Sequence, residues 1–304
     1  MMRAEAPTSA ISIPAADIPA VLEPPETQKT AEPAALPPST APGQDVAAEP
    51  PALAKPGGQS QVVDITDPAF QYQQGLAYLN GNGTPNGPDQ AQAAHWFGLA
   101  SDQGLPEASY QLALLYQEGR GVVRDQGRAL SLLKSAADRN YAEALFVLGR
   151  IYDQGQGVEP DLDLAAQYYL KAANLNLVEA QISLGQMYEQ EKGVPRDDAE
   201  AATWYAAAAN LGHPAAQYHL ALMYGRGRGV NQDYQLAAQW LSKAAYQHLP
   251  QAQAELGQYY YQGLGVDQDP QKAAELLHQA ASQGQASAQT TLENMQNEGL
   301  LDNP

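Results

Sequence analysis

The residue types in this chain that could support chemistry are five histidines, a Ser–Lys pair and 34 carboxylates. No histidine pair has H-E-x-x-H or other metal-ligand spacing. Cysteine is absent, which excludes a disulfide framework, a thiol nucleophile and thiolate metal sites. These groups therefore give no metal site, no cofactor and no catalytic residue. The histidines are His95, His213, His219, His248 and His278.

The Ser–Lys pair, Ser131 and Lys134, forms the S-x-x-K motif of penicillin-binding nucleophiles. The companion motifs S-D-N and K-T-G are absent, and both residues occupy ordinary variable positions of an expected helix. No carboxylate lies in an apolar stretch that would raise its pKa for acid–base work. We expect a noncatalytic protein. An envelope-associated cell-wall or β-lactam-binding enzyme is the alternative.

Paired glycines suggest a nucleotide-binding loop at first sight, but their context differs. A dinucleotide fingerprint needs a preceding strand, a third glycine and a later acidic residue. Here the glycines belong to the phrase Y-x-x-G-x-G-V, which recurs with a period of 36 residues. A fixed period of this size indicates a solenoid of repeated units. The tyrosines that open the phrase are Tyr116, Tyr152, Tyr188, Tyr224 and Tyr260.

Two further columns, that is, sets of equivalent positions in successive repeats, have the same period and define the repeat. An aspartate stands at the start of each alanine-rich amphipathic stretch, where its side chain can cap a helix N-terminus. A second column holds Gly, Asn or His, residue types that best tolerate positive φ and so end a helix. Each repeat is thus predicted to be helix A, a glycine turn, an Asp-capped helix B and a left-handed stop. The aspartates are Asp89, Asp125, Asp161, Asp197, Asp233 and Asp269; the stops are Gly104, Asn140, Asn176, Gly212, His248 and Gly284.

These columns carry a family resemblance. The chain resembles the Sel-one-like repeat (SLR) family of the tetratricopeptide superfamily over about residues 69–297, with the pattern A-x-x-x-L-G-x-x-Y-x-x-G-x-G-V-x-x-D-x-x-x-A-x-x-W/Y-x-x-x-A-A. The resemblance implies an all-α fold, an α/α superhelical solenoid that acts as a protein–protein adaptor. Six full repeats run to about Ser282, and a C-terminal capping helix follows. The complete match is Ala144, Leu148, Gly149, Tyr152, Gly155, Gly157, Val158, Asp161, Ala165, Tyr168, Ala172 and Ala173.

The N-terminal part differs in composition. Residues 1–60 contain 12 of the 22 prolines and no aromatic residue. Such a stretch cannot bury enough apolar surface to offset chain entropy. We predict a disordered, acidic Pro/Ala-rich segment over residues 1–66 and a solenoid over residues 67–304. The segment is either a tether or a dispensable tail.

Charge and hydropathy limit the partners and the compartment. The formal charge of −18 disfavours nucleic acid. No apolar run reaches the ~18 residues of a membrane span, and the N-terminus has no signal-peptide core. Cytoplasm is the default expectation; the alternative is a protein tethered in the bacterial periplasm or envelope. A protein or peptide is the expected partner.

The variable columns of helix A are the predicted binding surface. Fixed columns are structural, whereas positions that vary between repeats are free to encode specificity. Positions spaced by 4, 3 and 4 residues share one helix face, and in superhelices of this kind helix A generally lines the concave side. The alternative is a merely solvated face. The predicted partner-binding residues are Gln111, Leu114, Val147, Arg150, Ser183, Gln186, His219, Leu222, Glu255 and Gln258.

A second candidate surface is a basic ridge at the turn edge. On an acidic protein, a local row of cations could hold an acidic segment. Its members are Arg120, Lys192 and Arg228 in one column and Arg124 and Arg196 in another.

Overall fold

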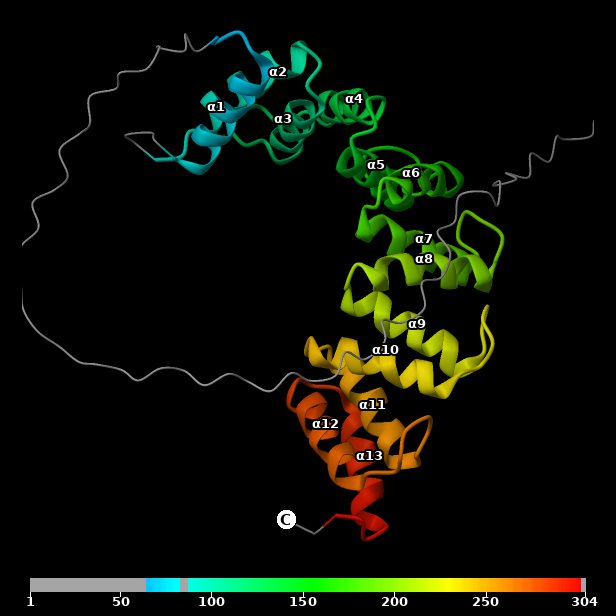
Figure 1. The fold of residues 1–304 in the computed structure, drawn as a ribbon. Helices are drawn as coiled ribbons and strands as arrows, with labels where there is room; N and C mark the ends of the chain where they lie inside the picture. The colour runs from blue at the N-terminus through cyan, green and yellow to red at the C-terminus, as the bar shows by residue number, and fades with distance from the viewer. Residues whose placement is uncertain (1–63, 83–86, 302–304) are drawn as a thin grey trace, which may run out of the picture. The chain divides into compact units, whose positions relative to one another are not determined.

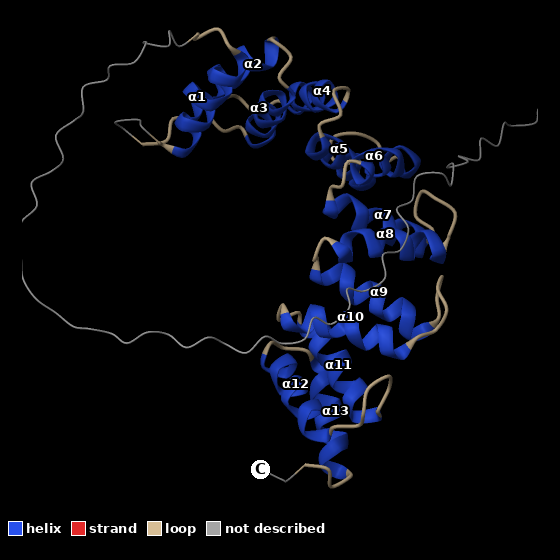
Figure 2. Cartoon of the chain, in the orientation of Figure 1, coloured by secondary structure: helices blue, strands red, loops and turns tan. Residues whose placement is uncertain are grey.

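The structure, a computed structural model, describes residues 64–82 and 87–301. In these residues the chain forms thirteen α-helices and no strand (Figures 1 and 2). The predicted disordered segment lies outside the described residues, apart from residues 64–66. The described residues from Ile65 onward belong to one compact unit. Its helices are α1 (Pro68–Asn80), α2 (Gln90–Asp102), α3 (Pro106–Glu118), α4 (Gln126–Ala137), α5 (Ala142–Gln154), α6 (Leu162–Asn174), α7 (Val178–Gln190), α8 (Asp198–Asn210), α9 (Pro214–Arg226), α10 (Tyr234–Tyr246), α11 (Pro250–Gln262), α12 (Pro270–Ser282) and α13 (Ala286–Asn297).

The helices pack in chain order, as a solenoid requires. The odd-numbered helices are A helices, and each of them from α1 to α11 packs most extensively against the helix B that follows it. Each helix B then packs against the next helix A. Figure 1 shows this succession of pairs from α1 to α12, with α13 at the end. The predicted α/α solenoid is therefore confirmed.

The aspartate column caps helix B in every repeat, as predicted. Asp161 Oδ1 accepts a hydrogen bond of 2.9 Å from the backbone N–H of Leu164, and the other five aspartates accept equivalent bonds. The backbone N–H of each aspartate also donates to the carbonyl of the repeat tyrosine, as Asp161 does to Tyr152 at 2.9 Å. One residue thus closes the glycine loop and starts the next helix.

The left-handed stops are also confirmed. All six predicted positions have positive φ, including the non-glycine residues Asn140, Asn176 and His248. Glu191 replaces the first turn glycine of its repeat, yet it adopts φ 56° and ψ 43° as the C-cap of α7. The turn keeps its geometry there at the cost of placing a side chain in the left-handed region.

The second glycine of the turn has a packing role between repeats. At Gly229 a Cβ atom would collide with the backbone of Asp198 and Ala199, at the start of the preceding helix B. Gly121 and Gly265 approach the corresponding helix starts in the same way. The G-x-G phrase therefore lets a loop lie on the backbone of the neighbouring repeat.

The core consists of small residues with leucine between them. The alanines at the repeat positions of Ala108 and Ala129 are at most 1% exposed throughout the stack. Leucines of helix A, such as Leu148 at 0% exposure, fill the space between layers. In α13, Ala288 and Leu292 keep these roles, while most of its other side chains are polar and exposed, as a terminal helix of a solenoid requires.

The glycine of helix A is matched in size to a residue of helix B. A Cβ atom on Gly149 would lie 2.6 Å from the ring of Tyr169, and one on Gly185 would lie 2.9 Å from the ring of Tyr205. Opposite Leu133 and Leu241 of helix B, helix A has Ala113 and Ala221, although Gly257 is kept opposite Leu277. The departures at Ala113 and Ala221 are thus paired volume changes.

Candidate functional site

The ten predicted partner-binding residues lie on five successive A helices, α3, α5, α7, α9 and α11. Arg150 is exposed and the other nine are partly exposed, so none belongs to the buried core. The structure thus places these side chains where a partner can reach them. They differ, however, in whether they already form hydrogen bonds or packing contacts within the chain.

Two polar members of the set have intramolecular hydrogen bonds. Gln258 Oε1 accepts a bond of 3.0 Å from Thr291 Oγ1 of the next A helix. Ser183 Oγ donates to a carbonyl of its own helix at 2.9 Å. Arg150 and Gln186 have no side-chain hydrogen bond or ion pair with any described residue.

His219 and Glu255 are partly desolvated. The His219 ring stacks on Tyr205 at a centroid distance of 4.8 Å and an interplanar angle of 9°. Burial lowers the pKa of His219 and raises that of Glu255, where the charge of Arg226 opposes the effect. His219 is therefore neutral at pH 7, and it packs against the core through one ring face. The expectation that no carboxylate has surroundings that raise its pKa was wrong for Glu255, because the packing of neighbouring helices buries it.

The predicted basic ridge is occupied by the chain's own carboxylates. Arg228 forms ion pairs of 3.0 Å with both Glu189 and Asp198, and Arg196 binds the same Asp198 at 3.1 Å. Tyr205 donates to the other oxygen of Glu189 at 3.0 Å, which extends the network into the core. Arg228 thereby joins the turn after α9 to α7 and α8.

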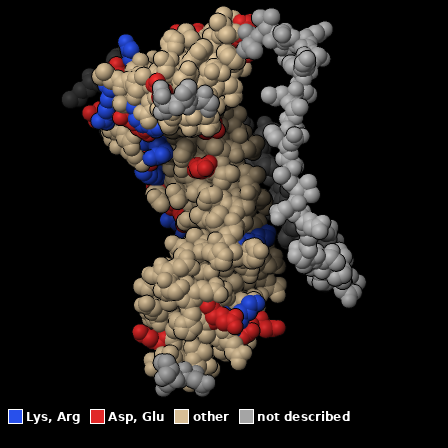
Figure 3. Space-filling model, turned by 90° about the vertical axis from the view of Figure 1, so that its left-hand side faces the viewer, with Lys and Arg blue, Asp and Glu red and all other residues tan. Residues whose placement is uncertain are grey.

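Two more ridge residues are also paired. Lys192 contacts Asp153 of the preceding A helix, and Arg120 contacts Glu118 at 2.9 Å. Only Arg124 of the ridge lacks an ion pair among the described residues. In Figure 3, basic side chains correspondingly lie beside acidic ones on the face shown. The sequence-based proposal of a ridge that holds an acidic segment is therefore not supported: most of its cations stabilise contacts within and between repeats.

The S-x-x-K pair has no catalytic geometry. Ser131 and Lys134 are both exposed on α4 and line an open groove with Leu130 and Ser135. Lys134 Nζ lies 5.9 Å from the ring centroid of Tyr152, and no hydrogen bond joins it to Ser131 among the described contacts. An activated serine needs its base within hydrogen-bond reach. Within the part of the chain that the structure describes, no group of three or more His, Asp or Glu side chains could hold a metal ion.

Sequence reasoning missed a column of buried glutamines on helix A. Gln181, Gln217 and Gln253 are at most 4% exposed. Each donates through Nε2 to a carbonyl at the end of the preceding helix B, as Gln217 does to Ala209 at 3.2 Å. Each of these carbonyls also accepts the backbone N–H of the left-handed stop residue, so the glutamine adds a second hydrogen bond at the end of helix B. The 36-residue period of the glutamines was the signal that could have revealed them.

Sequence reasoning also missed a group of tyrosines and glutamates on the first three A helices. Tyr110 and Tyr141 have ring centroids 5.3 Å apart, and Tyr72 acts electrostatically on Tyr141. Glu107 and Glu143 stand beside these rings. Glu107 stands four residues before Gln111 and so shares its helix face, but the convergence of three helices is visible only in three dimensions.

These features define a helical repeat protein of the tetratricopeptide-like superfamily. The model of the Sel1 repeat matches six segments, and the chain belongs to the Sel1 repeat family. Proteins of this family generally mediate protein–protein interactions. The matched segments are residues 68–105, 106–141, 142–177, 178–213, 214–249 and 250–285.

Two solved structures illustrate the similarity. The c5321 protective antigen of uropathogenic Escherichia coli, which has an SLR fold, is 37% identical with a TM-score of 0.73. The match covers 76% of this chain and 49% of the antigen, so the chain spans about half the length of that protein. A Sel1 repeat protein from Oxalobacter formigenes is 32% identical with a TM-score of 0.63, over 72% of this chain and 89% of that one. No curated protein matches the chain.

None of the described helices combines the length and the apolar character that a bilayer crossing needs.

Proposed function

We propose that this protein is a noncatalytic scaffold that binds a protein or peptide partner on the variable face of its A helices. The ten residues named above form that face. The proposal rests on the different roles of the repeated and the variable residues. The repeated residues form caps, turns and the core, whereas the variable A-helix residues remain accessible to a partner. Arg150 and Gln186, which have no partner within the described residues, are the strongest candidates for contact.

The composition of this face suits peptide recognition. It combines aliphatic side chains, amides that donate and accept, and single charges such as Arg150, so it can match different side chains along an extended segment. A surface with a few convergent polar groups among apolar ones gives orientation and specificity. The Sel1 repeat family supports the same conclusion at the level of protein binding.

A pull-down from the native host tests the proposal. The full chain is the bait, and captured proteins are identified by mass spectrometry. We expect the variant Arg150→Ala/Gln186→Ala to lose a protein that the wild type enriches. The matched control, Lys171→Ala/Gln239→Ala, changes exposed residues of helix B and should retain it. Retention by the first variant and loss by the control would contradict the proposed face.

The enzymatic alternative has a simple test. Incubation with a fluorescent penicillin should give no covalent label that depends on Ser131. A label that disappears in Ser131→Ala would overturn the noncatalytic proposal. The compartment stays a prediction, and fractionation of the native host distinguishes a cytoplasmic protein from an envelope-associated one.

A further inference from the structure

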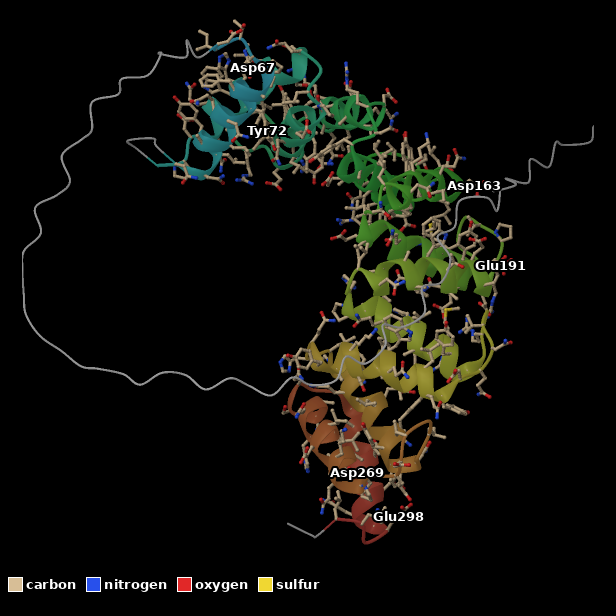
Figure 4. All side chains as sticks on the ribbon, in the orientation of Figure 1. Asp67, Tyr72, Asp163, Glu191, Asp269 and Glu298 are labelled. Carbon is tan, nitrogen blue, oxygen red and sulfur yellow. The ribbon has the colours of Figure 1, made fainter. Side chains whose placement is uncertain are left out.

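The A helices of the first three repeats bring three tyrosines and two glutamates together. Tyr72 lies on α1, Glu107 and Tyr110 on α3, and Tyr141 and Glu143 at the start of α5. We call these five residues the tyrosine–glutamate cluster. Figure 4 labels Tyr72 at its position on α1. The ring centroids of Tyr110 and Tyr141 are 5.3 Å apart, and both glutamates act electrostatically on Tyr72 and Tyr141.

The cluster lacks a cation of its own. Neither Glu107 nor Glu143 has an ion pair with any described residue. Glu107 Oε2 is shielded from solvent and accepts no hydrogen bond from the described part of the chain. Arg150 acts on Tyr110, but more weakly than Glu143 does. Two negative charges therefore stand beside aromatic rings without a basic partner.

The tyrosine hydroxyls add no negative charge to that of the two glutamates. Burial raises the pKa of Tyr72, Tyr110 and Tyr141, and the charge of the neighbouring glutamates raises it further. The hydroxyls are therefore neutral at pH 7. All three side chains are only partly buried, so ring surface remains accessible.

The cluster is a property of these repeats and not of the fold. Two repeats further along, Ile182 stands in the column of Tyr110, and Leu177 stands in the column of Tyr141 one repeat on. Glu179 stands in the column of Glu107 and Glu143 but has no tyrosine at these neighbouring positions. The fold is the same there, so the aromatic and acidic residues of the cluster are not needed to build it.

We propose that the tyrosine–glutamate cluster seats a basic side chain, an arginine or a lysine, from a segment of the partner protein. A cation over a tyrosine ring is attracted by the ring face, and an adjacent carboxylate provides a charge-assisted hydrogen bond. The charge of −18 favours the approach of such a segment. This inference rests on the proposed function and names the chemistry of the partner.

Fluorescence anisotropy tests the inference with the full chain. The probe is a fluorescein-labelled Gly/Ser peptide that carries four arginines, and its counterpart carries four citrullines, which are neutral and nearly isosteric. We expect the citrulline peptide and the variant Glu107→Gln/Glu143→Gln each to reduce affinity by about tenfold or more, as for loss of hydrogen bonds to charged groups. Circular dichroism verifies that the variant is folded.

The matched control separates specific recognition from general attraction to an acidic protein. Glu179→Gln/Glu275→Gln removes the same charge from exposed positions outside the cluster and should leave affinity within about twofold, as expected for exposed charges at physiological salt. Equal weakening by both double variants, or equal binding of the citrulline peptide, would overturn the inference.

The scaffold proposal and the basic-segment inference can fail independently of each other. If a partner is captured in the pull-down and depends on Arg150 but not on Glu107 and Glu143, the scaffold role stands and the basic-segment inference fails. If the arginine peptide binds the cluster but no protein depends on the A-helix face, the inference stands as a binding property and the scaffold proposal fails.

Discussion

The buried glutamine column contains one side-chain oxygen that accepts no hydrogen bond from the described residues, and a single substitution should supply the missing donor. Gln217 Oε1 accepts a bond of 3.0 Å from Gln247, a residue 30 positions later at the end of helix B. Gln253 accepts an equivalent bond from Gln283 at 2.9 Å. Gln181 is only 2% exposed, and its Oε1 has no donor among the described residues.

The missing donor follows from the repeat register. Thirty positions after Gln181 stands Leu211, which is 57% exposed and cannot donate. We predict that Leu211→Gln stabilises the protein by about 1 kcal/mol, because it satisfies a buried acceptor. The loss of a mostly exposed leucine should subtract only a few tenths of a kcal/mol. The melting temperature should rise by about 2–4 °C for a unit of this size.

Urea denaturation followed by far-UV circular dichroism measures the effect. The control is Leu175→Gln, in the same column one repeat earlier, where the residue 30 positions before it is Leu145 and offers no amide. Leu175 is 44% exposed, so the two substitutions are otherwise comparable. A denaturation midpoint for Leu211→Gln no higher than that for Leu175→Gln would refute the reasoning.

Three further predictions concern stability. Asp161→Ala should destabilise the protein by ~1 kcal/mol through loss of an N-cap, without loss of partner binding in a pull-down. Gly149→Ala should cost about 1–3 kcal/mol because its methyl group meets the Tyr169 ring. Adding Tyr169→Leu should recover part of that cost in a double-mutant cycle, whereas strictly additive effects would refute the paired-volume account. Hydrogen bonds from Arg228 are the main cause that lowers the pKa of Asp198 to about 2. This contribution is present above the unfolded-state pKa of about 4 and is lost as the pH falls toward 2. In Asp198→Asn, the free energy of unfolding should therefore depend less on pH between about 4 and 2 than in the wild type. An unchanged pH dependence in that range would contradict the assignment.

Features set by neighbouring residues could be predicted from the sequence. Asp161 caps a helix through an N–H three residues away, and Asn140 ends one by its own backbone conformation. Such local rules, repeated every 36 residues, were sufficient for the helix pairs and their order. Glu191 shows the limit of the same rules, because the repeat imposes a left-handed conformation on a residue that disfavours it.

Features that join separate repeats could not be predicted in the same way. Arg228 looked available in the sequence, yet its partners Asp198 and Glu189 lie 30 and 39 positions earlier. The tyrosine–glutamate cluster likewise needs three A helices, from Tyr72 to Glu143, to come together. The sequence period places each residue at its position in the repeat. It does not show where the side chain points or which residues it contacts.

Site-specific photo-crosslinking tests the central claim that the A-helix face binds the partner. A photoreactive amino acid replaces Arg150 or Gln186 on helix A, or Lys171 or Gln239 on helix B, and each protein is irradiated in the native host. The account predicts that positions 150 and 186 crosslink to the same protein, while positions 171 and 239 do not. Crosslinks to that protein from the helix-B positions alone would contradict it.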